Sequence, residues 1–196
     1  MCLQDKINTL QELCTRVMER SQIISNLNAM KVAIATMIFI AFGAISCKHP
    51  IPATGIDKEL LLLAKEPTGF NWYKDDPAYL SKSSGSGHNF GYLRTRFNAA
   101  ASTMLDSNGK VKAGSAFPEG SMIVKELSHD ASSVGRFAIL LKRTGHGAAD
   151  ERGWIWGYVN SDETVADAAS NKGYGCVGCH KQEGNIDYIL MNKFFP

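Results

Sequence analysis

Four strand-like segments lie between residues 91 and 159, and they limit the fold more than any other feature of the chain. Each is rich in aliphatic and aromatic residues, and turn-forming residues interrupt the sequence between them. Their short spacings favour antiparallel pairing, because a parallel crossover needs a dozen or more residues. The predicted strands are residues 91–97, 122–127, 137–142 and 154–159.

Short helical patterns flank these strands. In residues 56–64, charged residues precede a run of leucines, and the pattern stops before Pro67. Residues 164–171 are predicted to form a second helix, capped by Asn160 or Ser161. The sequence therefore predicts an α+β fold, a mostly antiparallel β-sheet domain with short flanking helices.

The main chemical signal lies near the C-terminus, in Cys176-Val177-Gly178-Cys179-His180. C-x-x-C-H is the attachment site of c-type haem. Cysteines three positions apart share one face of a helical turn, where both thiols can bond the vinyl groups of one porphyrin. The histidine then reaches the iron as axial ligand. The motif predicts one covalent haem c held by Cys176, Cys179 and His180.

Two alternatives compete with haem at this motif: a zinc half-site and a dithiol redox pair. Structural zinc usually takes four protein ligands from two such pairs, and the chain has no second cysteine pair. A thioredoxin-like pair belongs near the start of a βαβ unit, whereas this motif lies close to the chain end. Both alternatives are therefore weaker than haem.

Residues 30–46 have the pattern of an export signal. Lys31 precedes an apolar run over residues 32–45, which is short for a membrane span but suits a signal peptide. Small residues followed by Cys47 resemble a bacterial lipoprotein cleavage site, although Ala44 stands where leucine is usual. We predict a lipoprotein signal peptide with lipid on Cys47; an uncleaved anchor or an ordinary signal peptide are the alternatives.

Export and haem attachment support each other, since bacteria attach haem c outside the cytoplasm. We predict a lipid-anchored protein on the periplasmic side of the cell envelope, with the choice of inner or outer membrane left open. Translation is predicted to start at Met30, because residues 1–29 are too long and too mixed in charge for the start of a signal. The expected divisions are residues 1–29, a wrongly included upstream extension; 30–46, the signal peptide; 47–70, a tether and short helix; and 71–196, the haem domain.

Charge and motif position exclude other classes. A net charge of +2 with no long basic run gives no sign of a nucleic-acid-binding surface. Ordinary small cytochromes c carry C-x-x-C-H near the N-terminus of a helical fold, with a methionine ligand well downstream. Here only Met191 follows His180, after too short a segment to wrap a haem. A six-coordinate His/Met electron carrier is disfavoured.

From about Trp72 to the C-terminus the chain resembles the cytochrome P-460 family, which includes cytochrome c′-beta. The resemblance rests on the order of several motifs rather than on one of them. They are His88 with YLRTRFN at residues 92–98, FPEGSMIVKE at 117–126, WIWGY at 154–158, the C-x-x-C-H motif, and Asp187-Tyr188.

The resemblance implies a single haem c on a mostly antiparallel β fold, with five-coordinate iron, an open distal side and a homodimer. Cytochrome P-460 oxidises hydroxylamine, and the lysine of its Val-Lys-Glu element is cross-linked to the porphyrin. Cytochrome c′-beta has an apolar distal pocket and binds nitric oxide. By match of motif, Lys125 is the cross-link candidate and Arg94 the candidate for the distal pocket.

The residue pattern around Lys125 gives this role independent support. On an alternating strand Lys125 shares its face with Ile123 and Leu127, where burial would lower the lysine pKa and expose a nucleophilic neutral amine. The alternative is a lysine that reaches solvent from an edge strand. Arg94 and Arg96 share one face, so we expect one of them to be surface charge.

Hydroxylamine oxidation also needs a proton acceptor beside the iron. The resemblance implies a carboxylate shortly before the haem motif, and the sequence does not choose among the residues there. The candidates are Asp162, Glu163, Asp167 and, closer in, Asn171. His88, His129 and His146 lie beside loop-like sequence and are not predicted as iron ligands.

The leading hypothesis is an exported haem enzyme that oxidises hydroxylamine or a related small nitrogen compound and passes electrons to a partner cytochrome. The first alternative is a non-catalytic nitric oxide binder similar to cytochrome c′-beta. The second is a plain electron-transfer cytochrome, which the absence of a predicted distal ligand weakens.

Overall fold

The computed structural model describes residues 50–196. The predicted upstream extension (1–29), the signal peptide (30–46) and the lipid site Cys47 lie outside the described residues. Within residues 50–196, no helix is long and apolar enough to cross a membrane.

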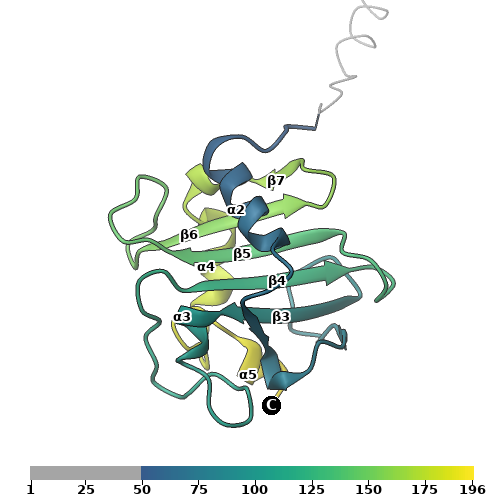
Figure 1. Ribbon diagram of the computed structural model, residues 1–196, viewed down its shortest axis with the longest axis vertical. Helices are drawn as coiled ribbons and strands as arrows, with labels where there is room; N and C mark the ends of the chain where they lie inside the picture. Colours follow the sequence, from purple (N-terminus) through teal and green to yellow (C-terminus); the bar gives the residue numbers. More distant parts are fainter. Residues whose placement is uncertain (1–49) are drawn as a thin grey trace, which may run out of the picture. The chain divides into compact units, whose positions relative to one another are not determined.

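An antiparallel sheet of seven strands forms the centre of the described region (Figure 1). Its order is β1-β3-β4-β5-β6-β7, with β2 also paired to β3. The strands are β1 (Phe70–Trp72), β2 (Leu80–Ser81), β3 (Tyr92–Asn98), β4 (Met122–Ser128), β5 (Arg136–Lys142), β6 (Trp154–Asn160) and β7 (Val165–Asp167). The predicted α+β class and the four long strands are confirmed, whereas the three shortest strands were not predicted.

The helices are short and lie mainly before and after the sheet. They are α2 (Gly55–Lys65), α3 (Ala99–Ser102), α4 (Tyr174–His180) and α5 (Met191–Phe194), with 3-10 turns at Tyr73–Asp75 and Ala169–Asn171. Helix α2 confirms the helix predicted at residues 56–64.

The helix predicted at residues 164–171 is wrong. Val165 pairs with Val159 in the sheet, and its amide donates to the Ile51 carbonyl at 2.7 Å. Glu163, just before, has a left-handed backbone (φ 70°) that no helix would accept. Pairing with distant segments therefore overrides the local helical pattern.

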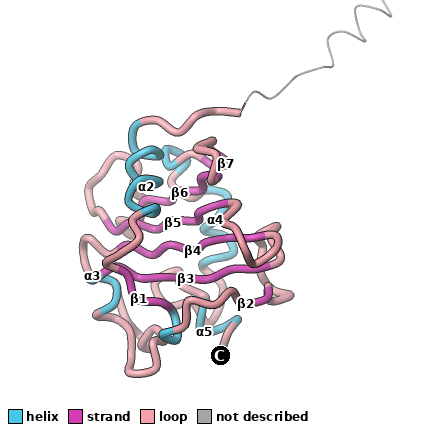
Figure 2. Tube along the Cα trace, turned by 45° about the vertical axis from the view of Figure 1, so that its right-hand side comes forward, coloured by secondary structure: helices cyan, strands magenta, loops and turns pink. Residues whose placement is uncertain are grey.

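The sheet is covered on both faces (Figures 1 and 2). On the face towards α2, here called the helix face, Leu60, Leu61 and Ala64 pack against Val124 and Ile155. Gly157 permits this close approach, because a Cβ there would lie 2.9 Å from Leu60 Cδ1.

The opposite face, here called the cavity face, is covered by the C-terminal segment from α4 to α5. Ile189 and Met191 of that segment pack against Phe97, Trp154 and Trp156 of the sheet. Because both faces are covered, β4 is buried at every position except Lys125, which is partly buried. The polar side chains of this strand therefore need a structural or chemical reason to be there.

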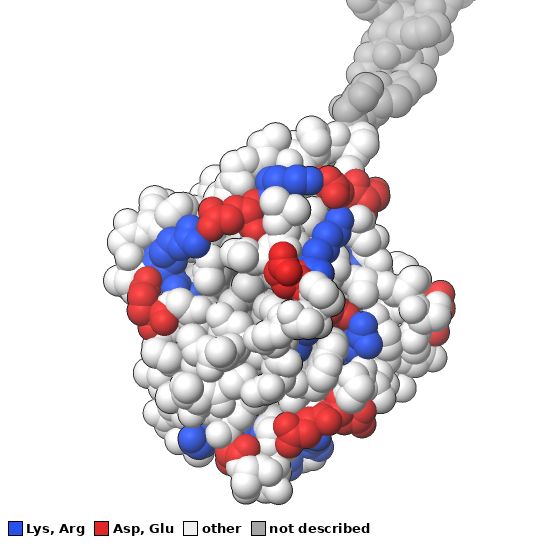
Figure 3. Space-filling model, in the orientation of Figure 1, with Lys and Arg blue, Asp and Glu red and all other residues white. Residues whose placement is uncertain are grey.

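The surface around α2 carries charges of both signs (Figure 3). Exposed ion pairs join α2 to neighbouring segments: Lys58 and Lys65 contact Glu163, and Glu59 lies 2.7 Å from Arg143. Exposed pairs of this kind contribute little to stability, about 0–1 kcal/mol each.

Candidate functional site

Helix α4 carries all three residues of the predicted haem site, Cys176, Cys179 and His180. It begins after Gly173, whose backbone is left-handed (φ 70°). A Cβ at Gly173 would lie 2.6 Å from the Trp156 ring, so only glycine lets the helix start so close to the sheet. Both thiols are free.

The His180 ring is oriented by its Nδ1 atom. Nδ1 lies 2.6 Å from the Tyr188 carbonyl, to which a ring protonated at Nδ1 donates. Trp156 packs edge-on against the ring, with centroids 5.2 Å apart. Burial, and secondarily the charge of Lys125, lower the His180 pKa to about 4. A neutral imidazole with Nδ1 bonded presents Nε2 as a metal ligand.

The Tyr188 carbonyl is held in turn by Asp187. The Asp187 carboxylate accepts from Trp154 Nε1 at 3.1 Å and the Phe117 amide at 3.0 Å, and it lies 3.4 Å from Lys142 Nζ. Asp187 and Tyr188 both have positive φ, 46° and 72°. Such backbone strain persists only where surrounding contacts enforce it. The turn that orients His180 is thus anchored to the sheet.

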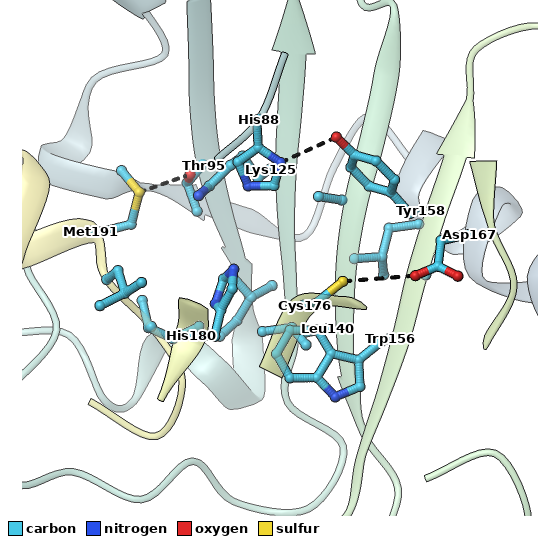
Figure 4. Close-up of a pocket in the computed structure, with 16 residues that line it drawn as sticks. His88, Thr95, Lys125, Leu140, Trp156, Tyr158, Asp167, Cys176, His180 and Met191 are labelled. Carbon is cyan, nitrogen blue, oxygen red and sulfur yellow. Dashed lines mark hydrogen bonds between the residues drawn. The ribbon is translucent and has the colours of Figure 1, made fainter. Parts of the chain in front are cut away.

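A cavity lies between α4 and the cavity face, and together with the open solvent at its mouth it holds about 600 Å³ of empty space (Figure 4). Most of its wall is apolar, and a second hollow continues it past Cys179. The polar residues that line it are His88, Thr95, Lys125, Tyr158, Asp167, Cys176 and His180.

Lys125 projects into this cavity from the middle of β4 (Figure 4). Ile123 lines the same cavity, as strand alternation predicts. Burial alone lowers the Lys125 pKa to about 8, and no charged or hydrogen-bonding partner among the described residues opposes that effect. The amine therefore loses its proton more readily than an exposed lysine does, which favours the neutral, nucleophilic form.

Among the carboxylate candidates, only Asp167 lines the cavity. Its Oδ2 lies 3.9 Å from Cys176 Sγ, and its Oδ1 accepts from Asn171 at 2.6 Å. Asp162 instead caps Thr164, while Glu163 pairs with lysines of α2. Burial, followed by the charge of Asp167, raises the Cys176 pKa to about 11, so this thiol is protonated at neutral pH.

Arg94 lies on the helix face, so the structure does not bring it into the cavity. Its neighbour Thr95 faces the cavity, and alternation turns Arg94 the other way. Arg94 Nε donates to Glu126 at 2.7 Å, and its guanidinium lies over Trp72. Arg96, on the same face, lies 2.9 Å from the same carboxylate.

His88 is the cavity residue that sequence reasoning did not predict. It lines the cavity beside Lys125, and its Nδ1 lies 3.2 Å from the Tyr158 hydroxyl. Burial, followed by the charge of Lys125, lowers its pKa to about 3. His129 instead stacks on Phe90. Its signal in the sequence was its place just before the YLRTRFN segment, in the order of motifs on which the family resemblance rests.

Met191 also lines the cavity, although a methionine ligand was disfavoured. Its sulfur accepts a hydrogen bond from Thr95 Oγ1 at 3.3 Å. Within residues 50–196 no three His, Cys, Asp or Glu side chains cluster closely enough to hold a metal ion by themselves. Two thiols and one oriented imidazole beside an apolar cavity are instead the donor set of haem c.

No protein-family model, no curated protein and no solved structure matches the chain.

Proposed function

We propose that the chain binds one haem c in the cavity, with thioethers to Cys176 and Cys179 and with His180 as axial ligand. The observation that carries this proposal is the bond from His180 Nδ1 to the Tyr188 carbonyl, at 2.6 Å. It selects Nε2 as the ligating atom on the same short helix as both thiols. Each thiol would add its S–H across a vinyl double bond, which needs no oxidant.

The proposed activity is oxidation of hydroxylamine or a related small nitrogen compound. The bound haem would supply a redox-active iron site for the substrate, and electrons would leave to a partner cytochrome. Asp167, which lines the cavity, would accept a proton from the substrate. The apolar wall of the cavity would exclude bulk water and strengthen the electrostatic effect of these few polar groups.

Lys125 is the proposed point of cross-linking to the porphyrin. Its amine lines the cavity without a charged or hydrogen-bonding partner in the described part of the chain, and this setting and its lowered pKa support the role. The bond would replace one N–H and one C–H bond with an N–C bond. A two-electron oxidant such as peroxide would take up the released electrons and protons.

A second candidate is reversible binding of nitric oxide without turnover, as in cytochrome c′-beta. The largely apolar lining of the cavity favours it, because such a wall suits a small uncharged ligand. A plain electron-transfer cytochrome is a third candidate. In all three, the protein would be exported, anchored through lipid on Cys47 at the periplasmic side of the envelope, and paired as a homodimer.

The test of activity is the optical spectrum of the reduced protein together with its tryptic peptides. We expect an absorption band far to the red of ordinary haem c, and a haem peptide joining residues 176–180 to the Lys125 segment. Lys125→Leu should restore an ordinary haem c spectrum and abolish hydroxylamine oxidation, whereas Lys82→Leu, at an exposed lysine, should change neither. An ordinary spectrum and nitric oxide binding without turnover in the wild type would replace the enzyme with the binder.

A further inference from the structure

A second imidazole faces the same cavity as His180. His88, from the loop between β2 and β3, lines both the cavity and the hollow that continues it, as does His180. The ring centroids of His88 and His180 are 6.5 Å apart, with a 74° angle between the ring planes (Figure 4). The two rings are separated by 92 positions in sequence but share one small space.

Both rings are held through the same kind of atom. His88 Nδ1 lies 3.2 Å from the Tyr158 hydroxyl, and His180 Nδ1 lies 2.6 Å from the Tyr188 carbonyl. Tyr158 is itself packed under the guanidinium of Arg136, 4.5 Å from its ring centroid. The Tyr188 carbonyl can only accept, so His180 Nδ1 carries the proton and Nε2 keeps its lone pair. The His88 ring has a free Nε2 lone pair in the tautomer in which Nδ1 donates to the Tyr158 oxygen.

The spacing of the rings suits one metal atom between them. A metal–imidazole bond is about 2 Å long, so two such bonds on opposite sides of a metal separate the nitrogens by about 4 Å. The ring centres then lie farther apart than the two nitrogens. The observed distance of 6.5 Å between the ring centroids is consistent with this arrangement. Simple aromatic packing explains the contact less well, because both rings also line open space.

We propose that His88 is the second axial ligand of the haem iron in the resting protein, opposite His180. This inference rests on the proposed haem site and adds a displaceable ligand that regulates access to it. It replaces the five-coordinate iron that the family resemblance implies with a six-coordinate resting state. A small molecule such as nitric oxide or hydroxylamine must then displace His88 to reach the iron. The loop that carries His88 is rich in serine and glycine at residues 83–87, and a side chain added at Gly87 would meet no neighbour.

The test uses the full-length haem-loaded protein and reads the spin state of the ferric iron. We expect a low-spin, six-coordinate optical and electron paramagnetic resonance spectrum in the wild type. His88→Ala should convert it to high spin and speed carbon monoxide binding to the ferrous form by about tenfold or more, as expected when a blocked site becomes free. Added imidazole should restore the low-spin spectrum of His88→Ala.

Two further variants separate ligation from structural support. His129→Ala removes a histidine that stacks on Phe90 and should leave the spin state unchanged. Tyr158→Phe keeps the fold of β6 but removes the hydroxyl partner of His88, and should give a mixture of high and low spin. It also tests the inference if His88→Ala does not fold.

The outcomes distinguish this inference from the proposed function. Covalent haem with a high-spin wild type, or a low-spin spectrum that persists in His88→Ala, overturns the role of His88 alone. Haem that extracts freely from the wild type overturns the proposed attachment and the role of His88 with it.

Discussion

The two faces of the sheet differ in how their buried charged side chains are paired. On the helix face, Glu126 is nearly fully buried and contacts both Arg94 and Arg96. Arg96 also donates to the carbonyls of Glu66 and Ala64, at the end of α2. Every charge of this cluster has a partner, so the cluster fastens α2 to the sheet.

On the cavity face the adjacent residue of the same strand, Lys125, has no such partner among residues 50–196. Within the same described residues, His88 and His180 each have one ring nitrogen hydrogen-bonded. Groups left without partners in an apolar setting cost stability, and proteins retain them mainly where they have a chemical role. The contrast across one strand assigns structure to the helix face and chemistry to the cavity face.

The largest expected effect is on the cavity face, where removing both thiols should abolish the covalent attachment of haem. Cys176→Ala combined with Cys179→Ala should abolish covalent haem entirely, because both thioether bonds are lost. The wild type should retain its colour on the polypeptide after acid-acetone extraction, and the double variant should not. Circular dichroism should still report the antiparallel sheet, since neither thiol belongs to the sheet.

Removing the shared carboxylate tests the helix face. Glu126→Ala leaves two arginines without their ionic partner, and we expect a loss of about 3–5 kcal/mol in the free energy of unfolding. The matched control is Glu59→Ala, which breaks the exposed pair with Arg143 and should cost less than about 1 kcal/mol. Urea denaturation measures both. Equal losses would mean that the buried cluster has no special structural role.

A smaller effect is expected from the anchor of the His180 turn. Asp187→Asn removes a charge bonded to Trp154 and Lys142 and should cost about 1–3 kcal/mol. If haem is bound as proposed, the substitution should also raise its reduction potential, because the positive charge of Lys142 is then unbalanced near His180. Redox titration checks this, with Glu119→Gln, an exposed carboxylate bonded to Thr144, as the control. An unchanged potential would leave Asp187 a purely structural role.

A further effect is the pH dependence of stability contributed by Lys125. Its pKa is about 8 in the folded chain and about 10.5 when exposed. Between these values the unfolded chain binds more protons, so stability should rise with pH across the window from about 8 to 10.5. Below pH 8 the full cost of burying the ammonium is present. The measurement is the free energy of unfolding against pH in the background without covalent haem.

Lys125→Leu in that background should lose this rise and should be as stable as the parent or more so, because it buries no charge. Lys82→Leu should keep the rise, since Lys82 is exposed. If the rise persists in Lys125→Leu, another group causes it and Lys125 is not desolvated in solution.

The local sequence pattern predicts the structure correctly where residues that are close in sequence are also close in space. The alternation of β4 correctly put Lys125 beside Ile123, and the leucine-rich pattern predicted α2. It failed at residues 164–171, where pairing of Val165 with β6 outweighs a helical pattern of only a few residues. The alternation of β3 also predicted that Arg94 and Arg96 share one face. It did not predict that Glu126 and α2 cover that face.

The sequence alone predicted the proposed haem site, because its two thiols and its histidine lie at fixed short spacing on one short helix. It also determined the central antiparallel strands, whose patterns are local. Only the tertiary structure decided which other polar groups meet that helix. His88, Lys125 and Asp167 share the cavity, while Arg94 is turned away from it. These contacts join segments up to 92 positions apart, and the packing of both sheet faces, not spacing in the chain, creates them.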